Sequence, residues 1–216
     1  MPVAHAIRDI VPLERLTLGE RVYAELKELL VSGRVAPGER LSLRDSAKAL
    51  GVSMMPVREA VSRLVADRAL EVTPNRAVRV PVMTVSQFRE LAILRTQIEG
   101  FAAERAAALR TEGDLAAIAA QESAFRTESA KARPDLGRAV SLNKDLHFAV
   151  YAAAGMPMLM EIIGGLWLKA GPVLNLDLRA NPERLTQGVA LGCHARALAA
   201  IRARDGEGAR AAIAED

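Results

Sequence analysis

The sequence predicts a mainly α-helical protein with one short β-hairpin, and three observations carry this prediction. Alanine and leucine are abundant while aromatic residues make up only 3% of the 216 residues, a composition that favours helices. Half of the residues are hydrophobic, so the chain can bury a substantial core. Apolar residues recur every three or four positions along most of the chain, which is the spacing of a buried helix face.

Two helices are expected first in the chain. Residues 18–32 carry apolar side chains along one face, and Gly33 is placed to end this helix. Ser42 can cap a second helix, because its hydroxyl can accept a hydrogen bond from the first turn, and Gly51 ends that helix. The apolar faces of both helices would meet in one core.

A third helix and a hairpin follow. Ser53 can cap a helix over 54–69, in which Pro56 is tolerated because the first turn has no internal hydrogen bonds to lose. Residues 69–73 and 77–82 then have the composition of two short strands on either side of a proline-containing turn. Three helices followed by a hairpin are the layout of a winged helix-turn-helix, with the hairpin as its wing.

Only helical patterns follow from residue 84 onward. Glycine and proline positions interrupt them at 113, 134, 155–157, 181–182 and 206. The helices expected between these breaks are 84–109, 112–131, 135–154, 157–178, 182–204 and 206–216. We therefore expect two domains, an N-terminal winged helix-turn-helix over 1–82 and a C-terminal all-α helical bundle over 83–216.

Charge and cysteine content limit the class of protein. The net charge is +3, and its excess lies in residues 1–81, which hold 13 lysines and arginines against 10 acidic residues. This excess is compatible with phosphate binding.

Cys193 is the single cysteine, so a disulfide within the chain is excluded and a small buried residue is expected there. No apolar run approaches the roughly 20 residues that span a bilayer, and no signal-peptide core begins the chain, so we expect a cytoplasmic protein without membrane contact.

The third helix is the one expected to read DNA. In a helix-turn-helix the second of two crossed helices enters the major groove, where its first turn meets base edges, and the wing approaches the minor groove. Taken singly, these side chains could be solvated arginines, a helix cap or core methionines, and it is their joint placement on one face that favours DNA binding. The residues on this face are Arg44, Ser53, Met54, Met55, Pro56, Arg58, Asn75 and Arg76.

Three stretches occur in order between residues 18 and 80: SGRVAPGERL, LRDSAKALGVS and PVREAVSRLVADRALEV. Together they resemble the GntR family of bacterial regulators, and the resemblance implies DNA contacts from the face just described. Two positions depart from the family. Met54 stands where arginine is usual, so the base preference there should differ, and an apolar contact to a thymine methyl could substitute. The usual glycine of the wing is missing near Ala77.

Polar side chains on the later helices form a second candidate site. Asn143 and His147 are four residues apart in SLNKDLHFAVYAAA, so both project from one helix face, and His194 lies on a later helix. Metal sites in helical bundles are built from such inward-facing side chains. A histidine beside an apolar stripe is also often a hydrogen-bonded core residue, so spacing alone leaves both interpretations open.

The stretches LRTQIEGFAAERAA, NKDLHFAVYAAAGMPML and HARALAAIRARDGEGARAAI make residues from about 88 to 216 resemble the FCD ligand-binding domain of the FadR subfamily. The resemblance implies a divalent metal held by an Asp or Asn, by a His four residues later and by two further histidines. Asn143, His147 and His194 match the first three positions, and Asp216 stands at the fourth. Aspartate can ligate zinc, nickel or manganese. The alternative is that the histidines hydrogen-bond a ligand or each other.

The same resemblance implies a small organic acid as effector, held by the metal and by a basic group. Arg95 is the candidate basic group, with an intrahelical ion pair to Glu99 as the alternative. Trp167 and Pro172 could line the pocket. These features predict a transcriptional regulator that binds a palindromic operator in double-stranded DNA under control of a small carboxylate. A homodimer is expected from the family and from the two half-sites of such an operator, and action as a repressor or as an activator stays open.

Two other functions are weighed against this one. A metal-dependent hydrolase or lyase would need an open metal position and a general base, but the chain has no HExxH spacing, phosphate loop or nucleophile elbow. An architectural DNA-binding protein would need no effector, but the second domain holds far more chain than dimerisation requires. We therefore expect a regulator and not an enzyme.

Overall fold

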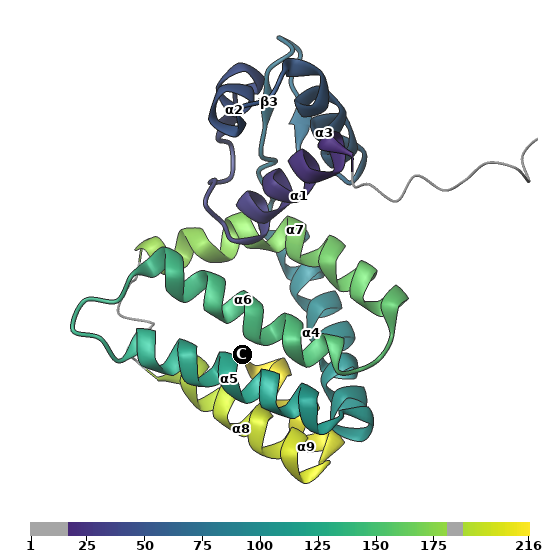
Figure 1. The fold of residues 1–216 in the computed structure, drawn as a ribbon, viewed down its shortest axis with the longest axis vertical. Helices are drawn as coiled ribbons and strands as arrows, with labels where there is room; N and C mark the ends of the chain where they lie inside the picture. The colour runs from purple at the N-terminus through teal and green to yellow at the C-terminus, as the bar shows by residue number, and fades with distance from the viewer. Residues whose placement is uncertain (1–16, 181–187) are drawn as a thin grey trace, which may run out of the picture.

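The computed structural model describes residues 17–180 and 188–216, and in it a small N-terminal unit stands on a larger bundle of helices (Figure 1). The N-terminal unit consists of α1 (Leu18–Val31), β1 (Arg40–Leu41), α2 (Leu43–Leu50), α3 (Met54–Ala66), β2 (Glu71–Val72) and β3 (Val78–Arg79). The bundle consists of α4 (Val85–Leu109), α5 (Glu112–Ser129), α6 (Leu136–Ala152), α7 (Pro157–Ala180), α8 (Val189–Ala203) and α9 (Gly206–Glu215). The predicted fold class is confirmed, and no helix within the described ranges is long and apolar enough to cross a membrane.

Of the two helix caps predicted, Ser42 and Ser53, one forms its capping hydrogen bond, and Thr17 adds a cap that was not predicted. Thr17 and Glu20 form a capping box at the start of α1, and the Ser42 hydroxyl accepts from the backbone N–H of Asp45 at 3.2 Å. Ser53 precedes α3 in an extended conformation, but its side chain makes no capping hydrogen bond. Ser53 is therefore the N-cap residue of α3, as expected, but its hydroxyl forms no capping hydrogen bond.

The sheet has one strand more than the sequence predicted. β1, β3 and β2 lie in that order, all antiparallel, with Arg40 opposite Arg79 and Val72 opposite Val78. β1 was missed because a strand of two residues is too short to show an alternating pattern. Its pairing ties the wing to the segment that leads into α2.

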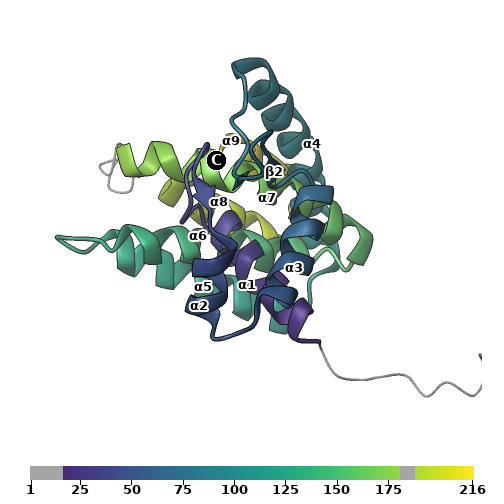
Figure 2. The ribbon, with the colours of Figure 1, turned by 90° about the horizontal axis from the view of Figure 1, so that it is seen from above.

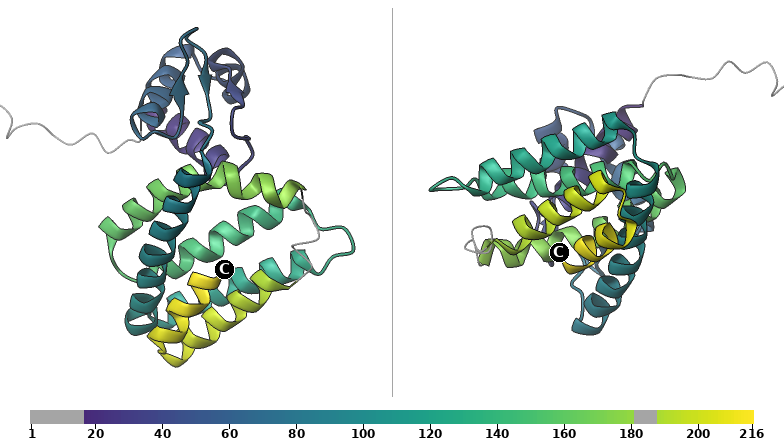
Figure 3. Two further views of the ribbon diagram at one scale, coloured as in Figure 1. Left: turned by 180° about the vertical axis from the view of Figure 1, so that it is seen from behind. Right: turned by 90° about the horizontal axis from the view of Figure 1, so that it is seen from below.

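The helical bundle is closed by two arginines that cap each other's helices. Arg110, at the end of α4, donates to the carbonyl oxygen of Arg202 at 2.9 Å, and Arg204, at the end of α8, donates to that of Ala108 at 2.8 Å. The last carbonyls of a helix lack partners within it, so each guanidinium satisfies groups that would otherwise be orphaned. These contacts hold the ends of α4 and α8 together beside α9 (Figure 3).

The N-terminal unit rests on α7, and α1 lies directly above that helix (Figure 2). A Cβ atom at Gly171 would lie 2.4 Å from the carbonyl oxygen of Leu30 and 2.6 Å from that of Val31, so this approach requires glycine. Nearby, Lys144 of α6 donates to Glu28 of α1 at 2.6 Å. The two units therefore meet backbone against backbone.

Candidate functional site

Most of the predicted DNA-reading side chains are exposed on the N-terminal unit. Six of them are exposed: Arg44, Ser53, Met55, Arg58, Asn75 and Arg76. Met55 is 65% exposed, whereas Met54 is half-buried and packs against the core, and Pro56 is buried at the start of α3. The first turn of α3 thus presents Ser53, Met55 and Arg58 to solvent.

The arginines of this surface are free to bind an anion. Among residues 17–180 and 188–216, the side chains of Arg44, Arg58 and Arg76 have no hydrogen-bond or ion-pair partner. Arg79 on β3 differs, because it pairs with Glu71 at 2.5 Å. Exposed guanidinium groups without partners are suited to phosphate oxygens and guanine edges.

The wing closes without glycine. The backbone N–H of Arg76 donates to the carbonyl of Thr73 at 2.8 Å, and Thr73 N–H donates to the carbonyl of Ala77 at 2.9 Å. Arg76 has φ +61°, a left-handed conformation that glycine adopts at lower cost. Asn75 supports the turn through its Oδ1, which lies 2.5 Å from the Thr73 hydroxyl. Arg76 therefore takes the left-handed position of the wing, and the Asn75 amide nitrogen is the part left for a phosphate.

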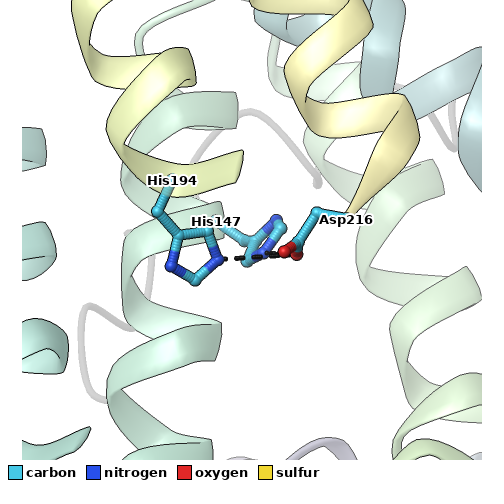
Figure 4. Close-up of side chains that lie close together, drawn as sticks. All are labelled: His147, His194 and Asp216. Atoms are coloured by element: carbon cyan, nitrogen blue, oxygen red, sulfur yellow. Dashed lines mark hydrogen bonds and ion pairs between the residues drawn. The ribbon is translucent and has the colours of Figure 1, made fainter. Parts of the chain in front are cut away.

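The second candidate site joins three helices of the bundle. His147 of α6, His194 of α8 and Asp216, directly after α9, point toward one another (Figure 4). Asp216 Oδ2 lies 2.9 Å from His147 Nε2 and 3.4 Å from His194 Nε2, and one donor atom from each residue falls within 4.8 Å of the others. The three side chains are only 4%, 1% and 10% exposed. The structure thus brings together three of the four predicted metal ligands.

Packing explains how these side chains reach one point. His147 lies on the buried face of α6 beside Tyr151, and His194 lies on the buried face of α8, where its ring meets Phe125 edge-on at 4.8 Å. Helix α9 packs against α4 and α8 through small residues and so delivers Asp216 to the histidines. Burial alone would raise the pKa of the Asp216 carboxyl, but contact with the two rings outweighs it and holds the pKa below its ordinary value. Asn143 is half-buried one turn before His147, so it stays a predicted fourth ligand.

A chain of buried polar groups reaches His147 from the opposite side. Arg95 contacts Glu99 through two hydrogen bonds of 2.6 and 3.1 Å, and the Tyr151 hydroxyl donates to Glu99 Oε2 at 2.5 Å. His147 Nδ1 lies 2.8 Å from the Tyr151 oxygen. Burial and the charge of Glu99 raise the pKa of Tyr151 well above its ordinary value, so the hydroxyl keeps its proton. Tyr151 is not among the predicted site residues, although its spacing of four from His147 was a usable signal.

Polar atoms without partners cluster around His147. In the described part of the chain, the buried side-chain atoms that lack a hydrogen bond are both ring nitrogens of His194, Trp167 Nε1 and Ser129 Oγ. The rings of His194 and Trp167 each lie 5.3 Å from that of His147. Buried polar groups are normally satisfied, so this concentration indicates a place for a bound ligand.

A pocket of about 270 Å³ opens beside the cluster between α4, α7 and the end of α9. Its charged lining residues are Arg95, Glu99, Glu215 and Asp216. Arg95 therefore lines the pocket and also forms the ion pair that was its alternative, while its guanidinium lies 4.8 Å from the Trp167 ring centre. Trp167 stands behind Arg95, and Pro172 is buried beside Gly171 at the contact with α1, so neither lines this pocket. Cys193 is buried, as expected.

Comparison with known proteins gives two family matches. The family of bacterial regulatory proteins called gntR matches residues 18–80, and the FCD domain matches residues 90–216. The HTH-type transcriptional regulator McbR of Escherichia coli K12 is 34% identical over 204 residues, which cover 94% of this chain and 90% of that protein. The HTH-type transcriptional repressor RspR of the same organism is 25% identical over 92% of this chain and 85% of that protein.

Solved structures agree with these matches. The structure of E. coli McbR/YncC superposes with a TM-score of 0.85 at 34% identity and covers 93% of each chain. A structure from Rhodococcus sp. RHA1, described as a transcriptional regulator GntR, superposes with a TM-score of 0.69 at 25% identity and covers 90% of each. The fold described above is thus shared along nearly the whole chain.

Proposed function

The chain belongs to the GntR family of bacterial regulatory proteins and carries an FCD domain, and on this premise we propose that a small carboxylate controls its binding to operator DNA through a divalent metal. It is a transcriptional regulator with a DNA-binding helix-turn-helix and an effector-binding domain. The proposal adds a cytoplasmic homodimer that acts as a repressor on a palindromic site. The observation that carries it is the buried His147, His194 and Asp216 cluster beside an effector-sized pocket.

DNA is bound by residues 1–82 in this proposal. The first turn of α3 enters the major groove, where Arg58 meets a guanine edge or a phosphate and Met54 and Met55 face thymine methyl groups. Arg44 on α2 binds the backbone beside it, and Arg76 on the wing reaches toward the minor groove, whose negative potential attracts arginine. Two copies related by a two-fold axis would match the two halves of a palindrome.

The bundle over 83–216 holds the metal in this proposal, and its residues fit one. Two imidazoles and a carboxylate suit zinc, nickel or manganese, and His194 leaves both ring nitrogens without hydrogen-bond partners. His147, His194 and Asp216 would hold the ion, with Asn143 as the fourth ligand. When bound, the metal supplies the positive charge that a carboxylate effector needs at this end of the pocket.

The effector would lie between the metal site and Arg95. The pocket volume of about 270 Å³ suits a small molecule, and its apolar walls come from α4, α7 and α9. Arg95 can offer a donor to a carboxylate while it keeps its contact with Glu99, because a guanidinium has five N–H groups.

Helix α7 is the route from the effector to DNA in this proposal. Trp167 contacts the rings of His147 and Phe148, and Gly171, one turn later, touches the end of α1. A ligand shifts the N-terminal unit relative to the bundle only if it binds one arrangement of the two units more tightly than the other.

Fluorescence anisotropy with DNA from upstream of the gene tests the proposal. We expect tighter binding to this DNA than to scrambled DNA, a steep loss of affinity with added salt, and a change in affinity when metal and small carboxylates are added together. A matched control is the Arg58→Ala variant, which should lose binding to both DNAs while the bundle still takes up metal. A protein that binds metal and carboxylates but keeps the same DNA affinity would contradict the regulatory part of the proposal.

A further inference from the structure

The polar chain that runs from Arg95 to His147 has a defined direction. Arg95 can only donate hydrogen bonds, and the Glu99 carboxylate, which faces it at 2.6 Å, can only accept them. The Tyr151 hydroxyl, 2.5 Å from Glu99, must therefore donate its one hydrogen bond to that carboxylate. The direction of the first two links is thus set by chemistry alone.

The last link follows from the first two. Once its proton is given to Glu99, the Tyr151 oxygen can only accept, and the atom it faces at 2.8 Å is His147 Nδ1. Nδ1 must therefore carry a hydrogen, which leaves Nε2 as the nitrogen whose lone pair can bind a cation. Nε2 is the atom that faces Asp216 at 2.9 Å. An imidazole nitrogen and a carboxylate oxygen aimed at each other are the arrangement of two ligands around one cation.

We propose that Glu99 and Tyr151 are positioning residues, which hold His147 in the Nδ1–H form and so present its Nε2 to the metal. This inference rests on the proposed metal site. Ligating histidines commonly donate their other ring N–H to a carboxylate or carbonyl, which fixes the ring and its tautomer. Here a tyrosine is inserted between the histidine and the carboxylate, and Arg95 holds that carboxylate in place.

These hydrogen-bonded side chains connect the pocket to the proposed metal site. Glu99 and Arg95 line the pocket, whereas Tyr151 is fully buried behind it. A ligand that draws Arg95 away from Glu99 also acts on the hydrogen bond that orients His147. The metal and the pocket are therefore coupled through the Arg95, Glu99 and Tyr151 side chains as well as through direct contact.

Two substitutions test the direction of the hydrogen bonds between Glu99, Tyr151 and His147. Tyr151→Phe removes the acceptor for Nδ1 and keeps the ring. Glu99→Gln keeps the size of the side chain but replaces one acceptor oxygen by an NH2 group, so Arg95 and Tyr151 can no longer both bond as they do to the carboxylate, and the fixed direction of the Tyr151 hydroxyl is lost. Tyr23→Phe is the matched control, since Tyr23 also donates to a carboxylate, Asp67 at 2.9 Å, far from the site.

The measurement is Zn²⁺ affinity of the full chain, stripped with a chelator and titrated against a competing metal dye. We expect about 10–100-fold weaker binding for Tyr151→Phe and Glu99→Gln, and unchanged binding for Tyr23→Phe. ¹⁵N NMR of the Zn²⁺-loaded protein should show the His147 hydrogen on Nδ1. If Glu99→Gln fails to fold, Tyr151→Phe and the NMR spectrum decide the question.

The outcomes separate this inference from the proposed function. If the unaltered protein takes up no Zn²⁺, the metal site fails and the inference fails with it. If the protein binds Zn²⁺ and both variants bind it as tightly, the metal site stands and the positioning role is overturned. A hydrogen found on Nε2 of His147 in the loaded protein would overturn it as well.

Discussion

Gly171→Ala is the most direct probe of how the two units meet. The added methyl carbon would lie 2.4 Å from the carbonyl oxygen of Leu30, whereas ordinary carbon–oxygen contacts begin near 3.3 Å, so α1 and α7 must separate by roughly 0.9 Å. The atoms that the methyl group would meet on α1, the carbonyl groups of Leu30 and Val31, are backbone atoms, so no change of side-chain rotamer can relieve the clash. The following residue, Pro172, adds to the strain because a side chain before proline disfavours helical geometry.

The magnitude can be isolated with a second glycine of the same helix. Alanine at Gly165 meets nothing within 4 Å, so Gly165→Ala should show only the helix-propensity gain of about 1 kcal/mol. Gly171→Ala carries the same gain together with an overpacking cost of about 1–3 kcal/mol. The difference between the two variants is therefore the cost of separating α1 from α7 together with the strain of a side chain before Pro172.

Thermal unfolding of both variants gives the answer. For a chain of 216 residues, a difference of 1–3 kcal/mol corresponds to a Tm lower by roughly 2–12 °C for Gly171→Ala than for Gly165→Ala. Equal Tm values would refute the reasoning, because they would mean that the backbone of α1 does not approach α7 as described.

Three further predictions concern the predicted DNA-binding residues and the helical bundle. Arg76→Gly should relieve a backbone cost of about 1 kcal/mol at the wing yet weaken DNA binding at every sequence, which anisotropy at two salt concentrations would reveal; unchanged affinity would remove Arg76 from the interface. Met54→Arg should move base preference toward guanine by about 1–3 kcal/mol, as measured by selection from a randomised DNA library, and an unaltered preference would show that this position does not meet bases. Arg110→Ala should destabilise the protein by about 1–3 kcal/mol in urea unfolding, because the last carbonyls of α8 lose their donor; a variant as stable as the parent would show that water replaces the arginine.

Local sequence signals were sufficient for most of the fold. Gly33, Gly51 and Gly155 were read as helix ends, and each adopts a positive φ in the structure, as helix ends and turns require. The expected helix over 54–69 is shorter, because the chain leaves the helix after Ala66 and Arg68 takes a left-handed conformation. The start of the helix expected over 182–204 lies partly outside the described residues, and from Val189 onward the helix is present.

The candidate site was only partly accessible from the sequence. The spacing of Asn143 and His147 marked one face of α6, but that Asp216 would reach the same point depended on the packing of α9, which no local pattern encodes. The contact of Gly171 with Leu30 was likewise invisible, because it joins residues far apart in the chain and has no periodicity. Long-range approaches of this kind are set by how helices pack, and only the assembled structure reveals them.

The charges of the pocket indicate why metal and carboxylate should act together. The pocket lining holds three carboxylates, Glu99, Glu215 and Asp216, and one guanidinium, that of Arg95. Arg95 is paired with Glu99, and Glu215 is paired with Arg196 at 2.6 Å. A carboxylate that approaches this end meets an acidic wall, and a divalent ion at His147, His194 and Asp216 would reverse the local balance. Each ligand then strengthens the binding of the other by the same factor, because the coupling free energy between two sites is reciprocal. Under the proposed function, the regulator should therefore respond more strongly to the acid when metal is present, and α7 would pass that joint state to α1.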